Sequence, residues 1–312
     1  MQNSLTVRNT IQITRNNTFA DLAKRFSDYL DISALSVKSY NVGVKKFLMF
    51  LHCNGISNPT RDTILLYKKE LISKHSANTV SLYLSALRRF FAWCESEGLY
   101  QDITRGVKSP HIDKGHKKDC FTANQIRQII TDIDRHSLKG MRDYALFALL
   151  SATGLRTVEV MRADICDIRV IQGETCLFIQ GKGKTSKADF VKLSEPVMKA
   201  ISEYLKARGN ISPNEPLFVS LSHRNAGKRM TTRSISRICK TAMRNAGFDS
   251  RRLTAHSLRH TAVTLALLAG MNLHDVSQFA RHSSINVTLI YSHDVERLKS
   301  HVESAISAAI FG

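Results

Sequence analysis

A small set of cations, one carboxylate and one tyrosine in the second half of the chain has the residue types needed for chemistry on a phosphodiester. His256 and Arg259 are three residues apart, so on a helix they share a face and pair a proton-transfer group with a bidentate phosphate binder. Guanidiniums neutralise the charge that develops on phosphate oxygens under attack, and a tyrosine hydroxyl attacks once a base or nearby cations activate it. The set comprises Arg156, Glu159, His256, Arg259, His282 and Tyr291.

Each of these residues also has an ordinary structural explanation. Arg156 and Glu159 are typical of a helix N-terminus that carries a surface ion pair. His256 and Arg259 fit the polar start of a helix, and Tyr291, which follows two apolar residues, fits a core tyrosine with a satisfied hydroxyl. The chemical interpretation therefore depends on the whole set.

The basic turn at residues 181–187 resembles a nucleotide-binding loop only in part. Phe178 occupies the position where a phosphate-binding loop needs its first glycine. Ser186 breaks the glycine pattern of a dinucleotide-binding turn. We therefore expect no nucleotide cofactor.

Metal-binding motifs are incomplete as well. His256 and His260 have the spacing of a zinc-protease helix, but that motif requires a glutamate where Ser257 stands. Asp164 and Asp167 alone make a weak case for a two-metal nuclease. We therefore expect no metal.

The composition predicts a polyanionic partner. Among 312 residues there are 45 lysines and arginines against 26 aspartates and glutamates, which gives a net charge of +19. Basicity alone is not specific, because DNA-binding, ribosomal and membrane-surface proteins share it. A hydrophobic fraction of 43% supplies a core and excludes a wholly disordered basic chain. At about 100 to 200 residues per domain, the length favours two domains.

The chain is expected to be cytoplasmic and associated with the nucleoid, with no membrane partner. No stretch reaches the ~18 consecutive apolar residues of a membrane span, and the N-terminus lacks the apolar core of a signal peptide. The six cysteines form no C-x-x-C pair, which argues against a zinc ribbon and a disulfide framework.

The first third of the chain is predicted to form an all-α DNA-binding domain over residues 17–100, after a flexible arm at residues 1–16. Four segments have helical periodicity, and Thr18 with Asp21 three positions later is typical of a helix start. Lysines and arginines recur along these helices and could follow a phosphate backbone, although exposed lysines often serve only solubility. Proline, glycine and clustered basic residues predict an interdomain linker at residues 101–118.

Residues 119–298 are predicted to form a second, larger domain. It begins with helical segments, and Gly154 is expected to end an apolar helix. Short β-rich runs at residues 176–179 and 189–193 flank the basic turn, which is typical of a hairpin. Helical patterns then resume toward the C-terminus.

The order and spacing of these motifs resemble those of the tyrosine recombinases, or phage integrase family, in the compact form of Xer-type and mobile-element enzymes. The resemblance runs from about Phe19 to Arg297. Its motifs are Gly154-Leu-Arg156-x-x-Glu159, the hairpin Gly181-Lys182-Gly183, His256-x-x-Arg259, His282 and Tyr291. It implies a mainly α fold with a small antiparallel β-sheet in an α+β catalytic domain, preceded by an all-α, SAM-like core-binding domain.

The resemblance implies that Arg156 and Arg259 clamp the scissile phosphate, that Glu159 supports the first arginine, and that His282 hydrogen-bonds a phosphate oxygen. The sequence departs from the family pattern at one neighbouring position. Arg281 stands where glycine usually precedes this histidine, which puts the local backbone in question unless Arg281 itself adds a phosphate contact.

The resemblance also implies that Tyr291 is the nucleophile, that His256 assists its proton transfer, and that Lys182 protonates the departing 5′ oxygen. Lys184 and Lys187 are close enough in sequence that the assignment of Lys182 depends on the G-K-G pattern. The resulting 3′-phosphotyrosine keeps the energy of the broken bond, so resealing requires neither ATP nor metal.

Residues 299–312 carry Val302, Ile306 and Ile310 as one apolar stripe on a short helix. In the family such a tail often docks on a neighbouring protomer, and packing on its own domain is the alternative.

The implied partners are duplex DNA with a specific recombination site, other copies of the chain in a homo-tetramer, and accessory DNA-bending or directionality factors. The expected role is integration or excision of a mobile element. Alternatives are Xer-type resolution of chromosome dimers, relaxation of supercoils as by a type IB topoisomerase, and a non-catalytic DNA-binding regulator.

Overall fold

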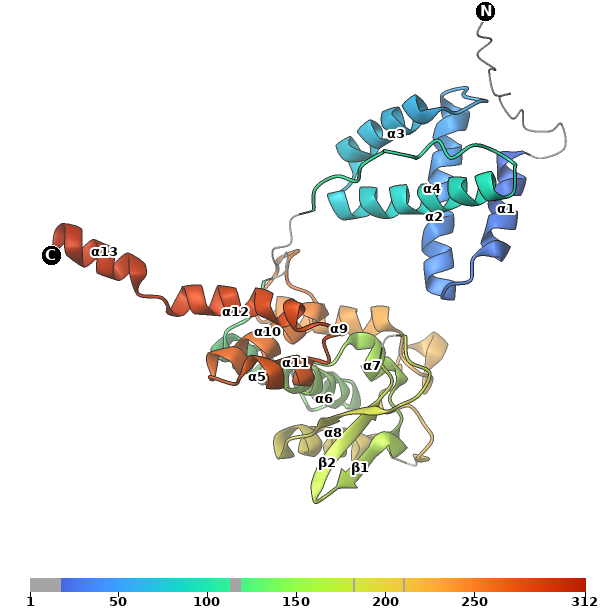
Figure 1. The fold of residues 1–312 in the computed structure, drawn as a ribbon. Coiled ribbons are helices and arrows are strands. Elements are labelled where there is room, and N and C mark those ends of the chain that lie inside the picture. The colour runs from blue at the N-terminus through green and yellow to red at the C-terminus, as the bar shows by residue number, and fades with distance from the viewer. Residues whose placement is uncertain (1–17, 113–118, 182, 210) are drawn as a thin grey trace, which may run out of the picture. The chain divides into compact units, whose positions relative to one another are not determined.

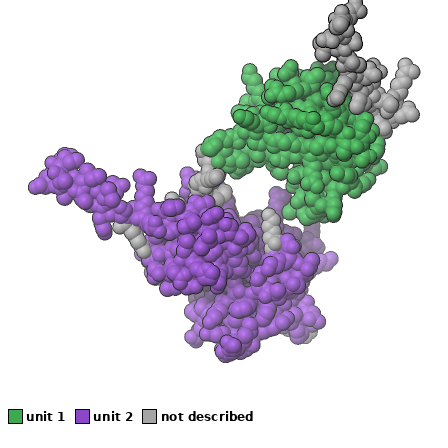
Figure 2. Space-filling view, in the orientation of Figure 1, with its two compact units in different colours: residues 1–114 green, residues 115–312 purple. Residues whose placement is uncertain are grey.

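The computed structural model describes residues 18–112, 119–181, 183–209 and 211–312. The chain divides into two compact units, residues 1–114 and residues 115–312 (Figure 2). The described elements are mostly helices, with a small antiparallel sheet in the second unit (Figure 1), which confirms the predicted fold class. None of the helices in these residues is long and apolar enough to span a membrane.

The first unit is all-α, as predicted. Its helices are α1 (Phe19–Tyr29), α2 (Ala34–Cys53), α3 (Arg61–Lys74) and α4 (Ala77–Ser96). Thr18 caps α1 in a capping box, in which its hydroxyl accepts the Asp21 N–H and the Asp21 carboxylate accepts the Thr18 N–H. Helix α4 packs against the other three and contributes much of the core.

Aromatic rings fill the core of the first unit. Phe26 meets Phe90 edge to face at 5.3 Å between ring centroids, and Phe47 meets Phe91 at 5.9 Å. All four rings are fully buried, and burial of one such side chain contributes about 1.5 to 3 kcal/mol. Because these rings come from α1, α2 and α4, their contacts join the helices into one unit.

The linker was predicted at residues 101–118, but the first residues of this range belong to the first unit. Ile103 and Val107 are buried in the core of the first unit, and Arg88 donates a hydrogen bond to the Val107 carbonyl at 2.8 Å. These two residues lie in an irregular segment without helical or alternating periodicity, so the sequence pattern did not reveal their burial. Residues 113–118 of the expected linker lie outside the described residues.

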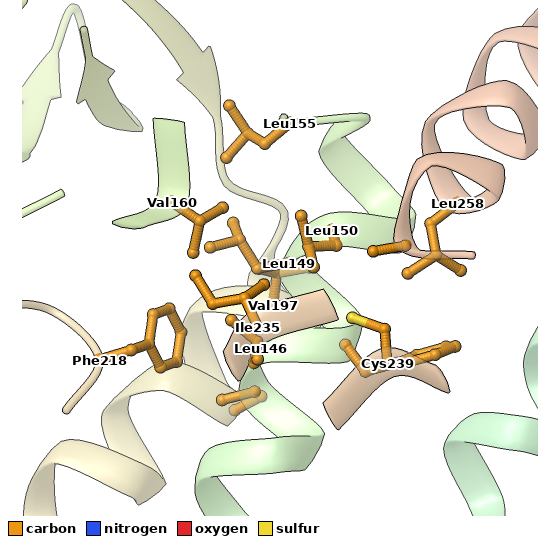
Figure 3. Packing of buried hydrophobic residues seen from close by; sticks show 14 of the residues in the cluster. Leu146, Leu149, Leu150, Leu155, Val160, Val197, Phe218, Ile235, Cys239 and Leu258 are labelled. Carbon is orange, nitrogen blue, oxygen red and sulfur yellow. The ribbon is translucent and has the colours of Figure 1, made fainter. Parts of the chain in front are cut away.

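The second unit is built around helix α6. Leu146, Leu149 and Leu150 of this helix lie in the middle of the hydrophobic core (Figure 3), against α8, α9 and α10. Gly154 ends α6 in the left-handed conformation, with a φ of 58°, as predicted. The helices and 3-10 turns are α5 (Ala123–Thr131), α6 (Leu138–Thr153), α7 (Thr157–Arg162), η1 (Ile165–Asp167), α8 (Glu195–Arg208), η2 (His223–Asn225), α9 (Thr232–Asn245), α10 (Ala255–Leu268), α11 (Leu273–Ala280), α12 (Ile285–Lys299) and α13 (Val302–Phe311).

The sheet consists of β1 (Ile168–Ile171), β2 (Glu174–Ile179) and β3 (Asp189–Lys192), in the order β1-β2-β3. Strands β2 and β3 are antiparallel, with Leu177 opposite Val191, which confirms the predicted hairpin. Both of these side chains are buried in the core, so the sheet packs one face on the helices.

Helix α13 carries the predicted apolar stripe, but the described residues of the chain do not cover it. Val302, Ile306 and Ile310 are 59%, 53% and 65% exposed, and the adjacent Phe311 is 84% exposed. No residue of α13 is buried. Packing of this tail on its own domain, one of the two alternatives, is therefore not observed.

Candidate active site

Arg156 and Glu159 form a structural pair at the start of α7. Arg156 is the N-cap residue of this helix, and its backbone N–H donates to one carboxylate oxygen of Glu159 at 2.7 Å. Its Nη1 donates to the other carboxylate oxygen at 3.0 Å. Glu159 is completely buried, so its carboxylate holds both the backbone and the guanidinium of Arg156 in place.

The guanidinium of Arg259, on α10, connects three segments of the second unit. Its Nη1 donates to the Gly154 carbonyl at 2.8 Å, and its Nη2 donates to the Ala280 carbonyl. The residue is 3% exposed. Burial, together with the neighbouring charges of Arg156 and Arg281, lowers the pKa of Arg259 to about 10. The three guanidiniums are therefore close enough to repel one another.

Tyr291 lies on α12 with its hydroxyl turned into the protein. The hydroxyl is hydrogen-bonded to Nδ1 of His260, and the two ring centroids lie 5.3 Å apart. The residue is 5% exposed, and burial raises the pKa of Tyr291 to about 12, although Arg259 and Arg156 act in the opposite direction. The phenol is therefore protonated at neutral pH, and its attack on a phosphate requires a proton acceptor.

His260 is the functional candidate that sequence reasoning missed. His256, which was expected to assist the tyrosine, is exposed, and its ring meets the ring of His260 edge to face at 4.7 Å. Positions i and i+4 are neighbours on a helix, so both histidines belong to one face of α10. This spacing was visible in the sequence. The sequence could not show that Tyr291 of α12 contacts His260, the second histidine of this pair.

His282 follows α11 and lies beside the tyrosine. Its ring is nearly parallel to that of Tyr291, with a centroid distance of 6.2 Å, and its Nδ1 lies 2.7 Å from Oγ1 of Thr288. Burial, and next the positive charges of Arg259 and Arg156, lower the pKa of His282 to about 4, so the ring is neutral at neutral pH. When Thr288 donates to Nδ1, Nε2 carries the hydrogen and can donate to a phosphate oxygen.

The backbone at Arg281 explains why glycine is usual at this position. Arg281 is the C-cap residue of α11, with φ 53° and ψ 48°. This left-handed conformation costs a residue with a Cβ roughly 1 to 2 kcal/mol, whereas glycine adopts it freely. Arg281 keeps the turn and donates from Nη1 to the Phe279 carbonyl at 2.7 Å and from Nη2 to Glu159 at 3.3 Å. The departure from the family pattern thus adds a guanidinium without changing the turn before His282.

Part of this site, namely Arg156, Glu159, Arg281 and His282, borders a cleft of about 710 Å³, whereas Arg259 and Tyr291 are buried and do not line it. Its lining includes Arg156, Lys184, Asp189, Arg281 and His282. The positively charged groups of this lining favour an anionic ligand such as a phosphodiester. Within the residues that the structure describes, no three His, Cys, Asp or Glu side chains gather as a candidate metal site.

The expected general acid, Lys182, lies outside the described residues. The nearby Lys184 lines the cleft, and its Nζ lies 3.4 Å from a carboxylate oxygen of Asp189. Lys184 is therefore a lysine of this turn that the structure places at the cleft.

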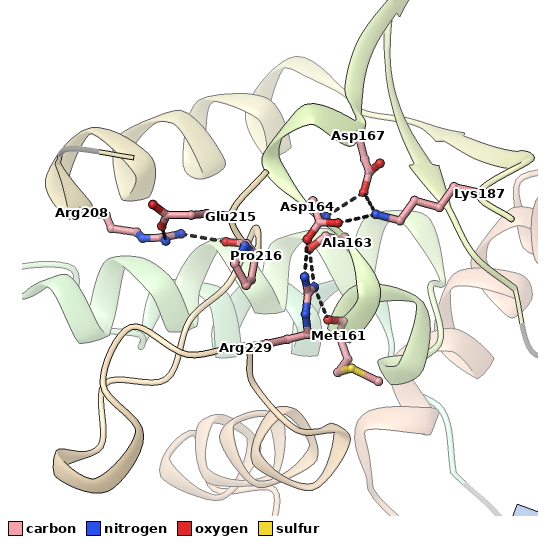
Figure 4. Close-up of polar contacts among 9 residues, drawn as sticks. All are labelled: Met161, Ala163, Asp164, Asp167, Lys187, Arg208, Glu215, Pro216 and Arg229. Carbon is pink, nitrogen blue, oxygen red and sulfur yellow. Dashed lines mark hydrogen bonds and ion pairs between the residues drawn. The ribbon is translucent and has the colours of Figure 1, made fainter. Parts of the chain in front are cut away.

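Lys187 has a different environment, because it is held by two carboxylates (Figure 4). Its Nζ lies 2.6 Å from an oxygen of Asp164 and also pairs with Asp167, while Arg229 binds the other oxygen of Asp164. These ion pairs raise the pKa of Lys187 despite its partial burial. Lys187 thus attaches the β2–β3 loop to η1 and is a poor proton donor.

A buried tyrosine among imidazoles and guanidiniums, in a helical unit with a small sheet, is the arrangement expected of an enzyme that attacks phosphodiesters with a tyrosine. The model of the phage integrase family matches residues 119–297, and the model of the phage integrase N-terminal SAM-like domain matches residues 23–98. The chain belongs to the phage integrase family. It is a tyrosine-type site-specific DNA recombinase, which confirms the resemblance stated from its motifs.

Relatives and solved structures agree with this assignment. The tyrosine recombinase XerA of Pyrococcus furiosus is 29% identical over 290 residues, which cover 92% of this chain and 94% of the relative. The XerH recombinase in a post-cleavage complex with difH DNA has a TM-score of 0.72 at 20% identity, covering 93% of this chain and 84% of that one. The Tn1549 transposon integrase in complex with circular-intermediate DNA has a TM-score of 0.67 at 17% identity, and the match covers 90% of this chain and 98% of the integrase chain. At these identities the two structures show a shared fold.

Proposed function

We propose that this recombinase cleaves and rejoins duplex DNA through a 3′-phosphotyrosine at Tyr291. The observation that carries the proposal is the position of this tyrosine. Its hydroxyl is hydrogen-bonded to an imidazole, and both Arg259 and Arg156 are near enough to stabilise its anionic form. A nucleophile, a proton acceptor and phosphate-binding cations thus lie within one unit.

In the proposed reaction, Arg156 and Arg259 bind the nonbridging oxygens of the scissile phosphate, and the neutral ring of His282 donates a further hydrogen bond. The Tyr291 oxygen forms a bond to phosphorus, and the bond from phosphorus to the 5′ oxygen breaks. The phenolic proton passes to His260, and the 5′ oxygen takes a proton from the cationic turn. Reversal of these steps with another 5′ hydroxyl reseals the strand, because the phosphotyrosine bond retains the energy of the broken one.

His256 remains part of this proposal through its contact with His260. The ring of His256 lies against His260, so it can orient that imidazole or exchange a proton with it. Lys182 remains the proposed acid, with Lys184 as the alternative in the described part of the turn.

The proposed substrate is double-stranded DNA bound by a homo-tetramer. The net charge of +19 and the DNA complexes of XerH and the Tn1549 integrase support a DNA partner. The uncovered apolar stripe of α13 supports docking on a neighbouring protomer, which would link assembly to activity. Accessory DNA-bending or directionality factors belong to the same proposal.

For the biological role we propose integration or excision of a mobile element, which the fold shared with a transposon integrase supports. Resolution of chromosome dimers is the second candidate, because XerA is among the sequence relatives. The two roles can be distinguished by sequencing the DNA junctions that recombination forms in a cell that carries the gene. Junctions at the ends of an element support the first role, and junctions at one chromosomal site support the second.

The first experiment measures covalent adducts on nicked duplexes made from DNA that flanks the gene, with EDTA and without ATP. The wild-type chain is expected to give an adduct on a denaturing gel, and Tyr291→Phe is expected to give none. Tight binding without any wild-type adduct would favour the non-catalytic regulator. Relaxation of supercoiled DNA without sequence preference would favour the topoisomerase-like activity.

A further inference from the structure

Arg281 brings an additional guanidinium to the cleft. Its backbone stands in the left-handed region at the end of α11, and its side chain, 12% exposed, reaches the buried carboxylate of Glu159. The two hydrogen bonds to Phe279 and Glu159 use two of the five N–H donors of a guanidinium. Among the described residues, no acceptor lies within hydrogen-bonding distance of the buried Nε. The side chain thus retains unused donors.

The charges around Arg281 are unbalanced. Glu159 is the carboxylate partner of both Arg156 and Arg281, while Arg259 is bound to two neutral carbonyls. Of these three neighbouring guanidiniums, two therefore pair with the same buried carboxylate, and the third is bound to uncharged groups. Burial lowers the pKa of Arg281 and that of Arg259, and repulsion among the guanidiniums adds to this effect. An anion entering the cleft would remove this repulsion.

We infer that Arg281 is a third phosphate-binding arginine, which donates to a nonbridging oxygen of the scissile phosphate and stabilises its transition-state charge. The inference rests on the proposed function of the site. In the alternative, purely structural role, Arg281 would only fix the carboxylate of Glu159, which in turn positions the guanidinium of Arg156.

The test compares single-turnover adduct formation by the wild type, Arg281→Gly and Arg281→Lys on two suicide duplexes. One carries a normal phosphodiester at the scissile position. The other carries a methylphosphonate, prepared separately as its two stereoisomers, each of which lacks one of the two nonbridging oxygens. Glycine suits the left-handed backbone, so Arg281→Gly removes the guanidinium without straining the turn. Gln172→Gly is the matched control, because Gln172 is exposed and also has a positive φ, of 49°.

Arg281→Gly is expected to cleave the phosphodiester about 10- to 100-fold more slowly than the wild type, less than the loss of a full oxyanion donor. On the methylphosphonate stereoisomer that lacks the oxygen to which Arg281 donates, the two are expected to agree within about threefold, because the charge that Arg281 stabilises is absent there. Arg281→Lys is expected to cleave at a rate between those of Arg281→Gly and the wild type, and Gln172→Gly is expected to match the wild type. All rates are compared at a temperature at which circular dichroism shows each variant folded.

An equal defect of Arg281→Gly on the phosphodiester and on both methylphosphonate stereoisomers, or no defect on the phosphodiester, would overturn the inference while leaving the proposed function standing. If the wild type forms no adduct on either substrate, the proposed function fails and the inference fails with it.

Discussion

The hydroxyl of Tyr291 is hydrogen-bonded to Nδ1 of His260, a residue 31 positions earlier in the chain. The tyrosine comes from α12 and the histidine from α10, and these two helices pack against each other. The ring of His282 lies over the tyrosine at 6.2 Å, so two imidazoles border the phenol. The packing of α10, α11 and α12 thus determines where the proposed nucleophile lies.

Tyr291→Phe tests the nucleophile. This change removes one oxygen and keeps the ring, so DNA affinity should stay within about twofold while covalent adducts disappear. Electrophoretic mobility shift and denaturing gels on the same nicked duplex measure the two quantities. Adduct formation by the variant would show that another residue attacks the phosphate.

A comparison of His260→Asn with His260→Ala tests the proton acceptor. Asparagine can place an acceptor near the position of Nδ1 but cannot take up a proton, so both variants should cleave roughly 10²- to 10⁴-fold more slowly. His256→Asn provides the matched comparison one helical turn earlier and should have the smaller effect. Cleavage by His260→Asn at the wild-type rate would mean that His260 only positions the tyrosine ring.

Arg259→Ala tests the phosphate clamp. Loss of its guanidinium should reduce single-turnover cleavage about 10²- to 10³-fold, as removal of an oxyanion donor does. It should also lower the melting temperature, because the carbonyls of Gly154 and Ala280 lose a buried donor. The variant is compared at a temperature where circular dichroism shows it folded. A rate within threefold of the wild type would remove Arg259 from the clamp.

The depressed pKa of His282, about 4 in the folded chain, predicts a pH dependence of stability. At pH values between about 4 and the ordinary histidine pKa of 6.5, this histidine binds a proton in the unfolded chain but stays neutral in the folded chain. The free energy of unfolding therefore falls as the pH falls through this range. His282→Asn should therefore lose less stability between pH 7 and pH 4.5 than the wild type, as measured by urea unfolding. His136→Asn, whose side chain is 99% exposed, is the control and should behave as the wild type. An equal loss in wild type and His282→Asn would contradict the prediction.

Deletion of residues 299–312 tests the role of the C-terminal stripe. Val302, Ile306 and Ile310 are exposed in the single chain, so their removal should leave its fold and its DNA binding unchanged. If the stripe docks on a neighbouring protomer, recombination and the formation of tetramers on DNA should be lost. Analytical ultracentrifugation of DNA complexes and a recombination assay provide the measurements. Unchanged recombination would refute docking.

Much of the fold follows from local features of the sequence. The Thr18 capping box, the stop at Gly154 and the hairpin around residues 181–187 each depend on a few neighbouring residues. The linker boundary was wrong because Ile103 and Val107 are buried by contacts with distant helices, which leave no periodic signal in a short segment.

The sequence by itself determined the class of this protein: the types and order of Arg156, His256, Arg259, His282 and Tyr291 were enough to predict a tyrosine recombinase by resemblance, and the family match confirms that class. Only the tertiary structure decided which groups meet. It placed His260 at the tyrosine hydroxyl, and it placed Arg281 on the carboxylate that holds Arg156. The reason is physical, because helix periodicity specifies which side chains share one face, whereas contacts between faces depend on how buried side chains of separate helices pack.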